Sequence, residues 1–186
     1  MKITILTVAA LMLAAGAQGK QESGRQVTVY LRDNATVPDP VKVQAEGLAS
    51  SMFADIGVTL HWRLGNAPLS EPGAIAIELL TNTPDMLLPG ALAYALPYEG
   101  VHIRIFWDRI GSDRTRTALL AHVMVHEITH ILQGVARHSD EGVMKARWTA
   151  EDRANLACKP LRFTPLDIDM IHKGMEARGA VEIAAK

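Results

Sequence analysis

The sequence is nearly free of cysteine, and Cys158 is the only one among its 186 residues. A chain with one cysteine has no internal disulfide, so a packed core must hold its fold together. Its 48% hydrophobic content is sufficient for one domain with a substantial core. We expect Cys158 itself to be a small buried apolar residue.

An excess of charge of either sign is also missing. The chain has 19 Lys and Arg residues against 20 Asp and Glu residues, and its formal net charge is −1. This balance argues against nucleic acid, or an anionic membrane surface, as the main partner.

Long hydrophobic runs are absent after residue 17. Residues 1–17 combine a basic start at Lys2, an apolar run and the small-residue pattern Ala15-Gly16-Ala17, which is typical of a cleaved signal peptide. The apolar run is shorter than the ~20 residues that a membrane-spanning helix needs. We therefore expect a single mature domain over residues 18–186 that is secreted or periplasmic and makes no membrane contact after signal cleavage.

Hydrophobic periodicity predicts both strands and helices in the mature chain. Apolar residues at helical spacing predict two helices, over residues 41–56 and 114–133, and β-rich apolar runs predict five strands, over residues 27–31, 58–64, 74–80, 91–96 and 101–107. The third of these runs is so uniformly apolar that we expect it to be buried on both faces. The last two are joined by a tight turn and predict an antiparallel hairpin.

Capping patterns predict two further helices near the C-terminus. Thr149 with Asp152 has the spacing of an N-terminal cap, and Thr164-Pro165 begins the last helix in the same way. We expect this last helix to end near Gly174 or Gly179. The order of elements predicts an α/β (α+β) layer built on a small twisted sheet.

The segment from His126 to His130 has the pattern His-Glu-x-x-His. On a helix these two histidines lie about 6 Å apart along the axis and on one face, so both imidazoles can reach one metal ion. Glu127 lies one step round the helix, close enough to contact a metal-bound water without binding the metal. A catalytic zinc takes three protein ligands and keeps one position open for water.

His138 is the preferred third ligand. Gly134 precedes it and can end the helix in a left-handed conformation that turns the chain back. Glu151 is the rival ligand, although an acid in the first turn of a helix also complements the helix dipole. Asp140 and Glu141 are further candidates, which we expect to be turn residues exposed to water.

The remaining histidines are expected to be structural or on the surface. His122 lies one turn before His126, but three histidines at this spacing on one helix extend over about 12 Å and cannot close on one ion. His61, His102 and His172 have no metal-ligand spacing.

The motif His126-Glu127-x-x-His130, followed by Gly134, His138 and Met144, resembles the metzincin clan of zinc metallopeptidases in the zincin superfamily. The spacing here is HExxHxxxGxxxH, whereas the usual metzincin pattern is HExxHxxGxxH. Each gap is one residue longer, and an extra helical residue rotates the exit by about 100°, so the turn must compensate.

The resemblance implies a metzincin-like fold, in which a small twisted mixed sheet with an antiparallel edge strand packs on a long backing helix and an active-site helix. It implies a Met-turn at Met144 beneath the metal. It also implies that an edge strand containing Ala91, Leu92, Ala93 and Tyr94 lines a cleft, where it can pair with an extended peptide. A hydrogen bond from Tyr94 or Tyr98 to an oxyanion is conceivable, but we favour half-buried hairpin aromatics for both.

The expected reaction is hydrolysis of a peptide bond with one Zn²⁺ ion. The metal lowers the pKa of its water and polarises the substrate carbonyl, and Glu127 is the general base that passes the proton to the leaving amine. The expected partner is a peptide or protein, bound by a monomer. Two alternatives remain: a zinc-containing protein of the same fold that binds a peptide or wall component without cleaving it, and a metal-free domain in which the histidines are incidental.

Overall fold

The fold is taken from a computed structural model that describes residues 25–71, 73–84, 90–111 and 115–184. The expected signal peptide lies outside the described residues. Within them, no helix combines the length and the apolar character that a membrane span requires.

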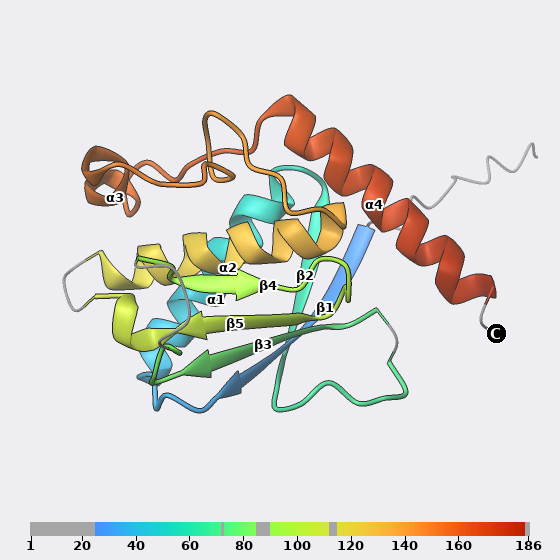
Figure 1. Ribbon diagram of the computed structural model, residues 1–186, viewed down its shortest axis with the longest axis horizontal. Helices are drawn as coiled ribbons and strands as arrows, with labels where there is room; N and C mark the ends of the chain where they lie inside the picture. The colour runs from blue at the N-terminus through green and yellow to red at the C-terminus, as the bar shows by residue number, and fades with distance from the viewer. Residues whose placement is uncertain (1–24, 72, 85–89, 112–114, 185–186) are drawn as a thin grey trace, which may run out of the picture.

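Five strands form one mixed sheet in the order β2-β1-β3-β5-β4 (Figure 1). These strands are β1 (Arg25–Asp33), β2 (Val58–Leu64), β3 (Ile75–Leu80), β4 (Ala93–Ala95) and β5 (His102–Phe106). The first three and β5 pair in parallel, whereas β4 pairs with β5 in the antiparallel sense. The five predicted strands and the hairpin are confirmed, and β4 is a short antiparallel edge strand.

Two helices, α1 (Asp39–Ala54) and α2 (Arg116–Gln133), pack against each other on one face of the sheet (Figure 1). Between them and the strands lies the hydrophobic core, in which Phe53, Ile77, Ile105 and Met124 are fully buried. Every residue of α2 from Ala118 to Gln133 is buried, because the C-terminal part of the chain covers the side of α2 that the sheet and α1 leave free. The His-Glu-x-x-His motif therefore lies on an enclosed helix.

The open face of the sheet corrects the prediction that residues 74–80 are buried on both faces. Alternate residues of β3 are buried, and the ones between them are only half-buried, because both helices lie on the same side. On the open side Arg32, Glu78 and Arg104 are aligned across β1, β3 and β5. Glu78 lies 3.9 Å from the Arg32 guanidinium and 3.5 Å from that of Arg104, so long polar side chains cover this face.

The C-terminal part contains the short helix α3 (Ala150–Asn155) and the long helix α4 (Pro165–Ala184), which packs against α2 (Figure 1). Thr149 and Asp152 form the predicted capping box of α3. The predicted end of the last helix is wrong, because α4 continues through Gly174 and Gly179. Gly174 is required for helix packing instead: a Cβ atom there would lie 1.8 Å from the backbone oxygen of Leu132.

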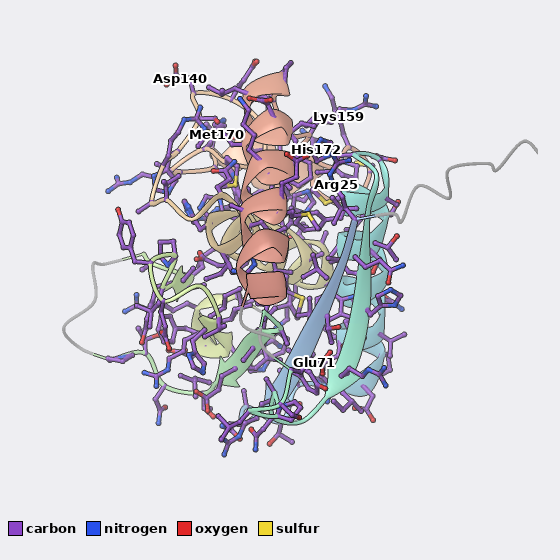
Figure 2. The ribbon with its side chains drawn as sticks, turned by 90° about the vertical axis from the view of Figure 1, so that its right-hand side faces the viewer. Arg25, Glu71, Asp140, Lys159, Met170 and His172 are labelled. Carbon is purple, nitrogen blue, oxygen red and sulfur yellow. The ribbon has the colours of Figure 1, made fainter. Side chains whose placement is uncertain are left out.

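Cys158 and three histidines lie away from the core. Cys158 is exposed after the end of α3, so its expected burial is wrong. It lies in the turn that follows α3, a helix without a buried residue, and its side chain faces solvent. His61 and His102 are exposed, and His172 on α4 pairs with the backbone oxygen of Ile56 at 2.9 Å, on the strand side of the helix (Figure 2). These histidines are structural or on the surface, as expected.

The close contact between α4 and α2 predicts opposite effects of two alanine substitutions. Gly174→Ala should lower the free energy of unfolding by about 1–3 kcal/mol, because the new methyl group overlaps the backbone of α2. Gly179→Ala is the matched control, since a Cβ atom at Gly179 would have nothing within 4 Å, and it should leave stability unchanged or raise it by up to about 1 kcal/mol. Chemical denaturation measures both, and equal effects would contradict this packing.

Candidate metal centre

The two histidines of the motif are oriented by backbone carbonyl groups. His126 Nδ1 lies 2.9 Å from the oxygen of Val143, and His130 Nδ1 lies 3.1 Å from the oxygen of Val135. A carbonyl oxygen only accepts hydrogen bonds, so each Nδ1 carries the proton and donates it. In a neutral imidazole the lone pair is then on Nε2, which is the nitrogen available to a metal.

These lone pairs point toward the same place. The Nε2 atoms of His126 and His130 lie 3.1 Å apart, close to the separation of about 3.3 Å that follows from tetrahedral geometry with Zn–N bonds of about 2.0–2.1 Å. Burial lowers the pKa of His126 to about 4, and it also lowers the pKa of His130. Two neutral nitrogens that face each other without a proton between them form a site suited to a cation.

His138 completes a triangle with these two histidines. Its ring centroid lies 5.3 Å from that of His126 and 5.0 Å from that of His130, which are themselves 4.7 Å apart. The possible ligand atoms of the three residues all lie within 4.8 Å of one another. Three imidazole nitrogens at this spacing match a catalytic zinc site, which has three protein ligands.

The chain reaches this position through the turn at Gly134. This glycine ends α2 in the left-handed region, with φ 68° and ψ 18°, and its N–H donates to the oxygen of His130 at 3.0 Å. Further on, the N–H of Ser139 donates to the oxygen of Met144 at 2.8 Å. Met144 is fully buried. The hydrogen bond closes a loop between Ser139 and Met144, and this loop holds the residues after the helix against α2.

Asp167 anchors both neighbours of His138. Its side chain is fully buried in the first turn of α4, where it accepts hydrogen bonds from the Arg137 guanidinium at 2.9 Å and the Ser139 hydroxyl at 2.7 Å. It also accepts from the backbone N–H and the hydroxyl of Thr164. One buried carboxylate therefore holds the side chains of the residues on each side of the third histidine.

Glu127 lies beside the histidines with little access to water. Burial raises the pKa of its carboxyl to about 8, and a hydrogen bond from the backbone N–H of Ala95 opposes that rise. Because β4 pairs with β5 through Leu92 and Leu96, the intervening alanines present their backbone groups at the free edge of the sheet. Glu127 is thus held at the boundary between α2 and this edge.

A cleft of about 460 Å³ opens beside the histidines. One wall is the β4 segment and the other is the chain from Lys145 to Trp148 with Arg153, and His126, Glu127 and His138 lie at the cleft. Ala91, Leu92 and Ala93 line it. Tyr94 does not, because its side chain points to the open face of the sheet, where its hydroxyl accepts a hydrogen bond from Arg104 at 2.9 Å.

The other candidates lie away from the three imidazoles or are otherwise engaged. Among the described residues, only the three histidines form a group with metal-ligand spacing. Glu151, Asp140 and Glu141 are exposed, and Asp140 points outward in Figure 2. Both ring nitrogens of His122 are used inside the protein: Nδ1 donates to the oxygen of Ala118 at 2.7 Å, and Nε2 accepts from the N–H of Leu161 at 3.1 Å.

Sequence reasoning missed two residues of this site. From the sequence, Asp167 can be interpreted only as a residue that caps a helix. No sequence pattern indicates that its side chain also binds residues about thirty positions earlier. Trp148 stands edge-on to His126, with ring centroids 5.8 Å apart, and its Nε1–H donates to the Val143 oxygen at 3.2 Å. Its place four residues after Met144 is the only signal that could have indicated it.

Comparison with known proteins identifies the fold. No protein-family model and no curated protein sequence matches the chain. The structure of archaemetzincin from Archaeoglobus fulgidus, determined with malonate, is similar with a TM-score of 0.53 at 12% identity and covers 77% of this chain and 99% of its own. Archaemetzincin from Methanopyrus kandleri gives 0.54 at 13% identity, over 83% and 98%. The chain therefore shares its fold with these two archaemetzincins.

Substitution of the two rival ligands tests which one completes the metal site. His138→Ala should weaken zinc binding by more than the roughly 10–100-fold that loss of an outer-sphere partner causes. Glu151→Ala should leave the zinc affinity unchanged, because Glu151 lies on the exposed side of α3. Competition with a chelating dye measures both affinities, and the reverse result would move the third ligand to α3.

The anchoring role of Asp167 predicts a loss of zinc affinity without loss of a ligand. Asp167→Asn keeps the size of the side chain but weakens its bonds to Arg137 and Ser139, so zinc should bind about 10–100-fold more weakly. Asp169→Asn is the matched control, since Asp169 is exposed on the same helix and pairs with Lys173 at 2.8 Å. Titration well below the unfolding temperature separates this effect from lower stability, and unchanged affinity would contradict the anchor.

Proposed function

We propose that the protein is a zinc-dependent endopeptidase that hydrolyses peptide bonds. The observation that carries this proposal is the convergence of three imidazoles beside the buried carboxyl group of Glu127, at a cleft bordered by an edge strand. His126, His130 and His138 would hold one zinc ion. When bound, zinc supplies Lewis acidity, which makes water easier to deprotonate and polarises a carbonyl group.

Glu127 is the general base of the proposed reaction. Its carboxylate takes a proton from the attacking water and delivers it to the nitrogen of the leaving amine. Burial favours the protonated form of the carboxyl, and a nearby cation favours the ionised form. These opposing influences keep proton exchange possible near neutral pH, while the N–H of Ala95 holds the carboxyl in place.

The free edge of β4 is the proposed binding position for the substrate backbone. Ala91 and Ala93 line the cleft with small side chains, so an extended peptide can approach their backbone closely. Pairing in this manner gives affinity through main-chain hydrogen bonds and leaves the opposite wall to choose among side chains. We infer that the partner is a peptide or protein and that one copy of the chain is sufficient for activity.

We also infer that the protein acts outside the cytoplasm, on the basis of the signal-peptide pattern of residues 1–17.

The alternative function is a zinc-containing protein that binds a peptide or wall component in the same cleft without cleaving it. The presence of Glu127 favours the enzyme, because a buried carboxyl beside the histidines is costly for stability and is not needed for binding alone.

Replacement of Glu127 by glutamine separates catalysis from metal binding. Glu127→Gln should retain the zinc content of the parent and lower kcat/KM for peptide cleavage about 100- to 10,000-fold, because general base catalysis is lost. Mass spectrometry of a peptide-library digest, with metal analysis on the same samples, measures both quantities.

A chelator provides the second arm of this experiment. Removal of zinc from the parent should abolish cleavage, and restored zinc should return it. Equal cleavage by Glu127→Gln and by the parent would exclude Glu127 as the base. A parent that binds zinc but cleaves no peptide in the library would favour the binding protein.

A further inference from the structure

The wall of the cleft opposite β4 carries positive charge. Lys145, Arg147 and Arg153 all line the cleft, and among the described residues Glu127 is the only acidic one that lines it with them. The chain as a whole has a net charge of −1, so this concentration of basic side chains is not a property of the general surface. It lies where the side chains of a bound peptide would project.

The acids closest in sequence do not neutralise the two arginines. Asp152 pairs with Lys145 and accepts the N–H of Thr149 as part of the capping box of α3. Glu151 is exposed and does not line the cleft. Among the described residues, neither Arg147 nor Arg153 takes part in any of the observed ion pairs or side-chain hydrogen bonds, and both are exposed. Their guanidinium groups are available to a ligand.

Guanidinium groups suit one kind of ligand in particular. Arginine presents several N–H donors in a planar fork that matches a carboxylate, and it binds this group better than lysine does. The facing wall of Ala91, Leu92 and Ala93 is apolar and uncharged. The two walls therefore differ: β4 offers backbone pairing, and the opposite wall offers cations.

We propose that the cleft selects peptides with a carboxylate beside the position of the metal, and that Arg147 and Arg153 bind this carboxylate. This substrate preference rests on the proposed peptidase site but does not require turnover. The carboxylate can come from an Asp or Glu side chain near the bond to be cleaved, or from the C-terminus of the peptide. The first source is that of an endopeptidase selective for acidic sequences, and the second is that of an enzyme acting at chain ends.

Peptide binding to the zinc-loaded Glu127→Gln protein tests the proposal independently of catalysis. The probes are five-residue alanine peptides with acetylated amino ends and amidated carboxyl ends, and with Glu, Gln or Lys at the centre. The Glu peptide should bind about fivefold more tightly than the Gln peptide, which corresponds to the contribution of about 1 kcal/mol from one well-formed exposed ion pair. The Lys peptide should bind most weakly. A fourth probe, an all-alanine peptide with a free carboxyl end, reports on the second source.

Substitution of the two arginines identifies the groups responsible. In the background of Glu127→Gln, the double change Arg147→Gln and Arg153→Gln should abolish the preference for the Glu peptide. Arg63→Gln is the matched control, because Arg63 is an exposed arginine on β2, at the edge of the sheet opposite β4. It should retain the full preference. Zinc content and unfolding temperature, measured on every variant, show that each is folded and loaded.

Each outcome has a distinct meaning. Equal binding of all four peptides, or an unchanged preference after the double substitution, would overturn the proposal. Tight binding only of the peptide with the free carboxyl end would assign the arginines to the C-terminus of the substrate. A preference for Glu in a protein whose parent cleaves no peptide would support the proposed selectivity while refuting the peptidase function.

Discussion

Two backbone carbonyl groups, those of Val143 and Val135, determine what the motif on α2 can do. Each accepts the Nδ1 proton of one histidine and thereby places the lone pair of that ring on Nε2. A histidine on a helix can turn either nitrogen toward a neighbour, so the motif alone leaves the ligand atom undetermined. The chain that follows α2 supplies the carbonyl groups, and the metal site therefore depends on how this segment closes over the helix.

The closed segment is itself held by a buried carboxylate. Asp167 accepts four hydrogen bonds and has no exposed surface, and a buried charge is tolerated only when it is paired and bonded in this way. Asp167 belongs to α4, and its hydrogen bonds join this helix to Arg137 and Ser139. The packing of α4 on α2 through Gly174 is consequently coupled to the position of His138, although Gly174 and His138 lie far apart in the sequence.

The cleft combines two walls that differ in chemistry. On the side of β4 it has small apolar residues and free backbone groups, and on the other side it has Lys145, Arg147 and Arg153. The α2 helix between them contributes His126 and Glu127. This arrangement separates the recognition of a peptide backbone from the recognition of its side chains, while the reactive groups lie between the two.

Sequence alone determined the local elements and the residues of the motif. The strands, the two core helices and the Gly134 turn follow from apolar periodicity and from glycine's freedom at positive φ, which are properties of neighbouring residues. Burial patterns and contacts could not be obtained in this way. The half-open face of β3, the exposed Cys158, the outward direction of Tyr94 and the continuation of α4 past Gly174 depend on which elements pack together. The same holds for the bonds of Asp167 to the neighbours of His138: these groups meet only because α4 folds back on α2, and no pattern within one segment encodes a contact between two.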